Sequence, residues 1–169
     1  MGHWVIWLFG HYDRHAVSCK SHCGGYDTCL GPLAMSAQSE ELKERTLQFA
    51  IGVLGMIDCF PRTIAADAVA RQLAKSAPSV AANYRSTCNA RSTKEFIAKL
   101  GVVVDESDES ELWLTISARM NLTKTANADR FRREAIELRN IFAKSLGTAR
   151  ANAKFAKKAK SSVTSVMTK

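Results

Sequence analysis

The chain has 169 residues and a formal net charge of +8; 46% of its residues are hydrophobic and 24% are charged. This balance is typical of one soluble domain that needs neither disulfides nor metal to fold. The longest apolar run, residues 4–9, is far shorter than the roughly 20 residues of a membrane span and lacks the flanks of a signal peptide, so we expect a cytoplasmic protein that does not cross a membrane.

Residues 1–34 are rich in Gly, His, Cys and aromatic residues and show no helical or strand period. We expect a poorly ordered or non-native extension, with Met35 as the initiator; a genuine accessory segment is the alternative. Cys19, Cys23 and Cys29 lie near three histidines, but their C-x3-C-x5-C spacing lacks the paired motifs of a zinc site. The sequence therefore predicts no metal and no cofactor.

Four helical patterns follow. In the first, apolar residues recur in steps of four and three from Leu42 to Phe60, after Ser39 as a candidate N-cap, and Pro61 ends the pattern. The second runs from about Ile64 to about Cys88, with small residues clustered over 74–82. Small residues allow close approach of helix backbones, and Pro78 predicts a bend.

The third pattern begins at Ser92, where Glu95 completes a capping box, and carries an apolar and serine stripe over 96–117. After a loop at 121–129, the fourth carries Phe131, Ala135, Leu138, Phe142 and Ser145 on one face. We therefore predict an all-α, antiparallel up-and-down four-helix bundle over residues 35–150. A basic C-terminal tail over 151–169 follows it, into which the fourth helix could continue.

Two stretches, 71–100 and 102–114, carry a family resemblance. They contain the segments QLAKSAPSVAANYR, ARSTKEFIAKL and an acidic run followed by Trp113 and Leu114. Over about residues 39–148 the chain resembles the four-helix-bundle proteins encoded in intervening sequences of 23S ribosomal RNA genes. Pro78 departs from the pattern, because the family commonly has a small residue there, and so does the long basic tail; residues 1–34 match nothing in it.

The resemblance implies a homopentamer of four-helix protomers. A related protein is the accessory protein of diversity-generating retroelements, which resembles a basic, barrel-shaped pentamer binding a reverse transcriptase and nucleic acid. For most members no activity is established. Leu47 and Leu54, seven residues apart and off the core stripe, form a second apolar line that fits such assembly.

An acidic run at 105–111 suggests either a carboxylate metal site or ion pairing. Because no histidine follows His22, we expect no metal there. We predict instead a partly buried polar network between the second and third helices. Its members are Arg71, Asn83, Arg85, Glu106 and Glu109. For Trp113 and Tyr84 we favour packing or subunit contact over stacking on bases.

The charge excess lies at the C-terminal end, where residues 122–169 hold 12 basic and 3 acidic side chains. We predict a non-catalytic oligomer that binds RNA, DNA or a ribonucleoprotein through this face. A protein-interaction scaffold without nucleic-acid affinity is the alternative. No catalytic triad, phosphate loop or metal-ligand spacing occurs in residues 35–169, so we expect no enzyme. The predicted nucleic-acid-binding residues are Arg130, Arg132, Arg133, Arg139, Lys144, Arg150, Lys154, Lys157 and Lys158.

Overall fold

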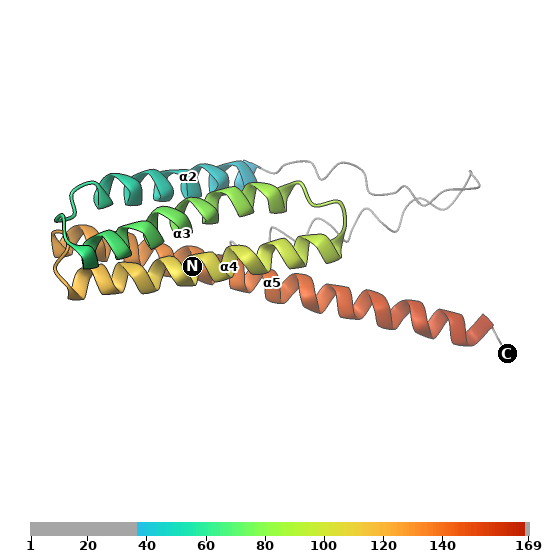
Figure 1. Ribbon diagram of the computed structural model, residues 1–169. Coiled ribbons are helices and arrows are strands. Elements are labelled where there is room, and N and C mark those ends of the chain that lie inside the picture. Colours follow the sequence, from blue (N-terminus) through green and yellow to red (C-terminus); the bar gives the residue numbers. More distant parts are fainter. Residues whose placement is uncertain (1–36, 168–169) are drawn as a thin grey trace.

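A computed structural model describes the backbone of residues 37–167 and the side chains of residues 37–157. Within this part the chain forms four helices and no strand (Figure 1). They are α2 (Ala37–Ile57), α3 (Ile64–Cys88), α4 (Thr93–Arg119) and α5 (Thr125–Met167). Short connections place successive helices antiparallel and side by side, and α2 also contacts α5. The all-α four-helix bundle is thus confirmed, whereas the predictions for residues 1–34 lie outside the described residues.

Local sequence signals explain where the helices begin. At Thr63 the side chain accepts a hydrogen bond from the Ala66 amide (3.2 Å), and at Ser92 from the Glu95 amide (3.1 Å). The predicted capping box closes one residue early, because Glu95 accepts from the Arg91 amide instead of that of Ser92. Helix α2 begins at Ala37, so Ser39 lies inside the helix and the prediction of Ser39 as its N-cap was wrong.

The end of α4 has a well-defined cap that the sequence reading left as a loop. Asn121 adopts a positive φ of 53°, which asparagine tolerates better than most residues. Its amide donates to Ala118 O (3.2 Å), and the Leu122 amide donates to Ser117 O (3.0 Å). This pair of bonds is a Schellman motif, with Asn121 in the position usually held by glycine. The motif turns the chain so that Leu122 is buried at the base of the bundle.

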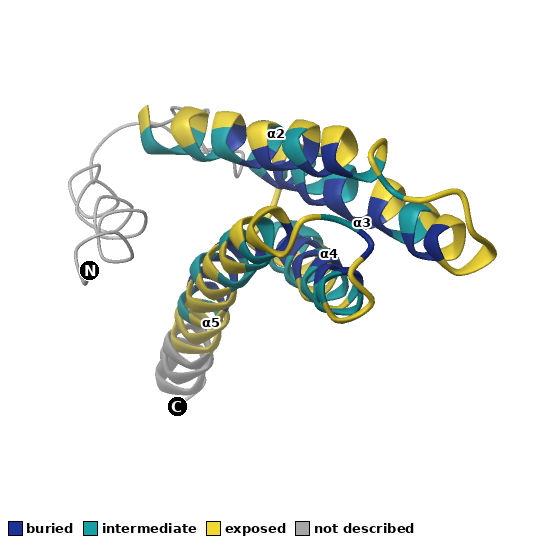
Figure 2. Cartoon of the chain, turned by 90° about the vertical axis from the view of Figure 1, so that its left-hand side faces the viewer, coloured by how far each residue is buried: buried dark blue, intermediate teal, exposed yellow. Residues whose placement is uncertain are grey.

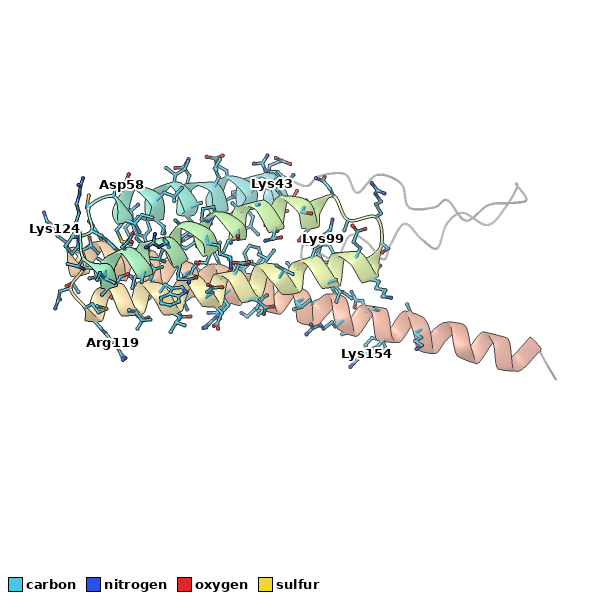
Figure 3. All side chains as sticks on the ribbon, in the orientation of Figure 1. Lys43, Asp58, Lys99, Arg119, Lys124 and Lys154 are labelled. Atoms are coloured by element: carbon cyan, nitrogen blue, oxygen red, sulfur yellow. The ribbon has the colours of Figure 1, made fainter. Side chains whose placement is uncertain are left out.

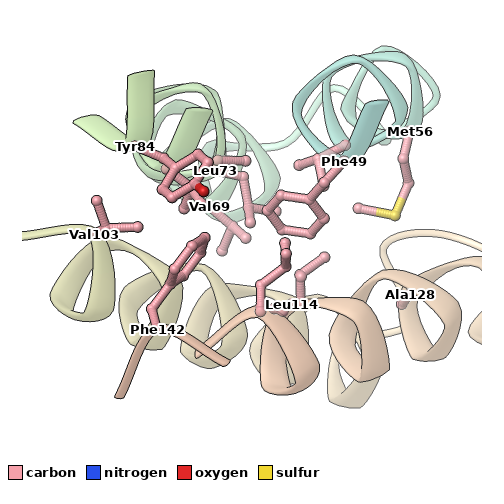
Figure 4. Packing of buried hydrophobic residues seen from close by; sticks show 14 of the residues in the cluster. Phe49, Met56, Val69, Leu73, Tyr84, Val103, Leu114, Ala128 and Phe142 are labelled. Atoms are coloured by element: carbon pink, nitrogen blue, oxygen red, sulfur yellow. The ribbon is translucent and has the colours of Figure 1, made fainter. Parts of the chain in front are cut away.

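The core follows the predicted stripes of all four helices (Figure 4). Its centre is formed by Val53, Leu73, Leu114 and Leu138, each fully buried. The ring of Tyr84 lies 5.0 Å from that of Phe142, centroid to centroid, and Tyr84 is only 6% exposed. Tyr84 is therefore a core residue and is not available to stack on a base.

Small polar residues join α3 and α4 where the two helices pack closely. Ser76 and Ser110 are both fully buried, and the Ser110 hydroxyl donates to Ser76 Oγ over 3.1 Å. Each hydroxyl is small enough to fit between backbones, and Ser110 also bonds its own helix at the Glu106 carbonyl. The cluster of small residues thus serves close packing at Ser76 and Ala77, as predicted. Helix α3 continues through Pro78 without a break.

Two contacts join α2 to α5 across the bundle. Arg45 pairs with Glu134 (Nε–Oε1 2.6 Å) and with Glu137 (Nη2–Oε2 2.9 Å). About two turns further along α2, Gly52 lies against the ring of Phe131. A Cβ at Gly52 would lie 2.5 Å from Phe131 Cε1. These contacts hold α2 against α5, the one neighbouring pair of the described helices that no short connection joins.

Helix α5 is much longer than its partners, with 43 residues against 27 in α4. At 1.5 Å per residue this is about 64 Å against about 40 Å. Its last turns diverge from α4 and project past the α3–α4 connection (Figure 1). What the sequence suggested as a tail over 151–169 is therefore helical through Met167 and continuous with the bundle.

No helix among the described residues is long and apolar enough to span a membrane. In the same part of the chain, no three His, Cys, Asp or Glu side chains converge in a way that would hold a metal ion.

Candidate nucleic-acid interface

Arg139, a predicted nucleic-acid-binding residue, is engaged within the bundle. Its Nη1 lies 2.6 Å from Asp108 Oδ1 and 2.6 Å from Glu111 Oε2, both on α4. The hydrogen bond to Asp108, aided by the charge of Glu111, raises the pKa of Arg139 above its ordinary value. A phosphate would have to compete with two carboxylates, so Arg139 joins α5 to α4 and does not belong to a free basic face. Binding of nucleic acid by Arg139 stays a prediction, now with two carboxylates as competitors.

The first turns of α5 are also less free than predicted. Arg132 lies 3.4 Å from Asp129 of the same helix. The guanidinium of Arg130 lies 5.4 Å from the centroid of the Phe131 ring, within range of a cation–π interaction. Arg130 and Arg133 are both exposed, and neither makes an ion pair among the described residues. This end of α5 therefore keeps two exposed cations of the three that were predicted.

The unpaired positive charge lies further along α5. Lys144, Arg150, Lys154 and Lys157 are all exposed, and none makes an ion pair within residues 37–157. The cause is the sequence, since no acidic residue follows Glu137 while residues 140–169 contain seven lysines and arginines. Figure 3 places Lys154 where α5 leaves the bundle, and Arg119 and Lys124 at the opposite end. The side chain of Lys158 lies outside the described part.

The predicted polar network between α3 and α4 does not form. Arg71 is exposed and pairs with Asp67 of its own helix, and Asn83 donates to the Ser79 carbonyl over 2.9 Å. Arg85 is exposed, and Glu109 accepts from Trp113 Nε1 over 3.2 Å. The fifth member, Glu106, is half-buried. The physical reason is that Ser76 and Ser110 occupy the centre of this contact, which leaves the long charged side chains on its outer edges.

The sequence reading missed Phe155, a large apolar side chain that is 72% exposed among the free cations of α5. Gly147, Arg150, Ala151 and Lys154 lie on the same face of α5 around it. An aromatic residue among lysines was visible in the segment ANAKFAKKAK. Only the course of α5 away from the bundle shows that this residue has no core to enter.

Comparison with known proteins assigns the bundle to a family. The sequence model of the 23S rRNA-intervening sequence proteins matches residues 39–144, more than half of the chain. The chain belongs to this family. A solved structure of a protein of unknown function from the S23 ribosomal protein family of Bacteroides thetaiotaomicron is similar in fold, with a TM-score of 0.58 at 20% identity. It covers 65% of this chain and 98% of its own length. No curated protein matches the chain.

Membership in the 23S rRNA-intervening sequence protein family accounts for the bundle but not for its basic extension. The match ends at residue 144, before Arg150, Lys154 and Lys157. Arg139, which is paired with carboxylates, lies inside the matched part. Arg150, Lys154 and Lys157 therefore lie beyond the family match, and their role is argued from this chain alone.

Proposed function

We propose that this member of the 23S rRNA-intervening sequence protein family is a non-catalytic, oligomeric helical-bundle protein that binds nucleic acid or a ribonucleoprotein. The binding surface is the C-terminal half of α5, from Lys144 onward. One observation carries the proposal: this half-helix leaves the bundle with exposed cations that have no acidic partner among the described residues. The family name, which refers to ribosomal RNA genes, is consistent with it.

The physical basis is counterion release. Cations that contact phosphates displace condensed counterions, so affinity falls steeply as salt rises and depends little on sequence. Lys144, Arg150, Lys154 and Lys157 lie within about four turns of one helix. Such a spacing matches an extended phosphate backbone better than a compact anion. Assembly of several chains would multiply the number of phosphate contacts.

A charge-reversal triple variant tests the proposal. Arg150→Glu, Lys154→Glu and Lys157→Glu together should weaken binding of a fluorescently labelled 30-nucleotide RNA by at least about 100-fold at low salt, because attraction becomes repulsion. The wild-type affinity should itself fall with rising salt in a titration of fluorescence anisotropy. Circular dichroism melting should show an intact bundle, because these three side chains pack against nothing in the described core.

The matched control places the same charge change at the other end of the molecule. Arg62→Glu, Arg119→Glu and Lys124→Glu alter net charge equally, and all three positions are exposed. This variant should bind nearly as well as wild type. Equal losses in both variants would mean that net charge, not the α5 extension, drives binding. If wild type fails to bind RNA or DNA at low salt but retains a specific partner protein, the scaffold function replaces this proposal.

The second part of the proposal is self-association, with five chains as the number implied by the family resemblance. An apolar line on α2 supports it, because Ile51 is 52% exposed and Leu54 38% exposed, with Leu47 half-buried beside them. These residues recur at steps of four and three along α2, whose side away from the other helices is exposed (Figure 2). Exposure of such apolar side chains to water is unfavourable, and their burial against another chain would be favourable.

A further inference from the structure

We infer that the α5 extension binds single-stranded nucleic acid and that Phe155 stacks on an unpaired base. This inference rests on the proposed function and names its ligand more closely. Phe155 is 72% exposed and does not belong to the hydrophobic core of the described residues. It lies one residue after Lys154 and two before Lys157. An aromatic face set among phosphate-binding cations is the pattern of single-strand binding surfaces.

The face of α5 around Phe155 combines small residues with cations. Gly147 and Ala151 lie on the same face as the ring, and nothing lies within 4 Å of the position that a Cβ on Gly147 would occupy. Arg150 and Lys154 lie on this face as well, where they are placed to bind phosphates next to a base that rests on the ring. Apolar and cationic groups thus stand side by side on one helix face.

Charge complementarity favours a single strand as the ligand. A second apolar helix could also cover Phe155, but it would bring no negative charge to Arg150, Lys154 and Lys157, which make no ion pair among the described residues. A duplex offers phosphates but keeps its bases stacked inside, so no base would be free to stack on the ring of Phe155. A single strand offers phosphates to the cations and an unpaired base to the ring.

The test compares single strand with duplex in the full-length chain. A 15-nucleotide RNA, a DNA of the same sequence and the duplex of each are titrated by anisotropy at one low salt concentration. Wild type should bind the single strands more tightly than the duplexes. Phe155→Leu, which keeps the apolar bulk but removes the aromatic face, should weaken single-strand binding by about 5- to 30-fold. The same variant should leave duplex binding unchanged.

Two further measurements complete the experiment. Phe155→Trp should bind single strands at least as tightly as wild type, because the larger ring stacks better. The slope of affinity against salt should be the same in all three proteins, because no cation has changed. Comparison of the RNA and DNA arms identifies which strand is preferred.

The outcomes separate the two proposals. If Phe155→Leu binds single strands like wild type, or loses single strand and duplex equally, the stacking inference is wrong while the proposed function stands. If wild type binds neither RNA nor DNA in a salt-dependent way, the proposed function fails and the inference fails with it. Tighter binding of duplex than of single strand by wild type would also overturn the inference.

Discussion

Glu106 is the carboxylate in the least favourable surroundings among the described residues. It is half-buried on α4, and its Oε2 is buried without a hydrogen-bond partner in the part of the chain that the structure describes. Burial, together with the negative charges of Glu109 and Asp105, raises the pKa of Glu106, and only Lys75 opposes them. The ionised form is therefore disfavoured in the folded state, and Glu106 should weaken the fold at neutral pH.

Replacement of Glu106 by glutamine tests this reading through its pH dependence. A raised pKa means that Glu106 holds its proton to higher pH in the folded protein than in the unfolded chain. Its contribution to the free energy of unfolding therefore falls as pH rises above about 4.3. Glu106→Gln should be more stable than wild type at pH 7 by about 0.5 kcal/mol, after allowance for solvent screening. Below pH 4 the difference should vanish. Urea unfolding followed by circular dichroism at both pH values measures it.

Glu109→Gln is the matched control, three residues away on the same helix. Because the Glu109 carboxylate accepts a hydrogen bond from Trp113 Nε1, its replacement should bring no gain at pH 7. A gain equal to that of Glu106→Gln would show that removal of any negative charge from this acidic run stabilises the fold, and the particular role assigned to Glu106 would be lost.

Single charged side chains were the part of the site that sequence could predict least. Arg139 was assigned to an external ligand, yet it pairs with Asp108 and Glu111 on the neighbouring helix. The register between α4 and α5 decides this pairing, and helical periodicity fixes the face of a residue but not its register against another helix. In contrast, Arg150 and Lys154 could be recognised as unpaired, because the chain holds no acidic residue beyond Glu137.

At the scale of helix pairs, the contact between α2 and α5 includes a close approach of Gly52 to Phe131. Gly52 and Gly55 occupy the interior of the same helix, where each costs about 1 kcal/mol relative to alanine. They differ in surroundings. A Cβ on Gly52 would lie 2.5 Å from the Phe131 ring, whereas nothing lies within 4 Å of one on Gly55. The pair therefore separates helix propensity from packing.

Gly55→Ala should raise the free energy of unfolding by about 0.5–1 kcal/mol, since it gains helix propensity at no steric cost. Gly52→Ala should lower it by about 1 kcal/mol, because the displaced Phe131 ring loses its packing and this loss exceeds the same gain. Chemical denaturation of both variants measures the difference. Adding Phe131→Leu to Gly52→Ala should recover part of the loss, and equal stabilisation by both alanines would show that α2 and α5 do not pack closely at this point.

Helices were predicted well because their signals are local. The stripe on α4 and the cap at Ser92 depend on residues within a few turns of each other. The predicted span of about Ile64 to about Cys88 likewise matches α3. The length of α5 was not resolved in the same way. Its apolar stripe weakens after Ala149, which reads as the end of a packed helix, yet alanine and lysine favour helix without any partner.

At the scale of the whole molecule, the apolar line on α2 carries the proposed self-association. The line of Leu47, Ile51 and Leu54 runs along α2 on the flank of its core residues. Ile64 is a useful contrast, because it is 94% exposed but stands alone at the loop end of the bundle. A continuous apolar line favours assembly, whereas a single exposed side chain is normal on a protein surface.

Light scattering coupled to size exclusion should therefore give wild type a mass near five times the 18.6 kDa of one chain. Ile51→Glu should reduce the mass to that of one chain, because five buried carboxylates around an apolar contact would each require desolvation. Ile64→Glu, with the same chemistry outside the line, should leave the assembly intact. A single-chain mass for wild type would refute self-association, and another multiple would refute only the number five. Dissociation of the assembly by both variants would show that the α2 line is not the specific interface. Because Ile51 is 52% exposed in the isolated chain, Ile51→Glu should leave the thermal stability of the protomer nearly unchanged, so that loss of mass reports on the interface alone.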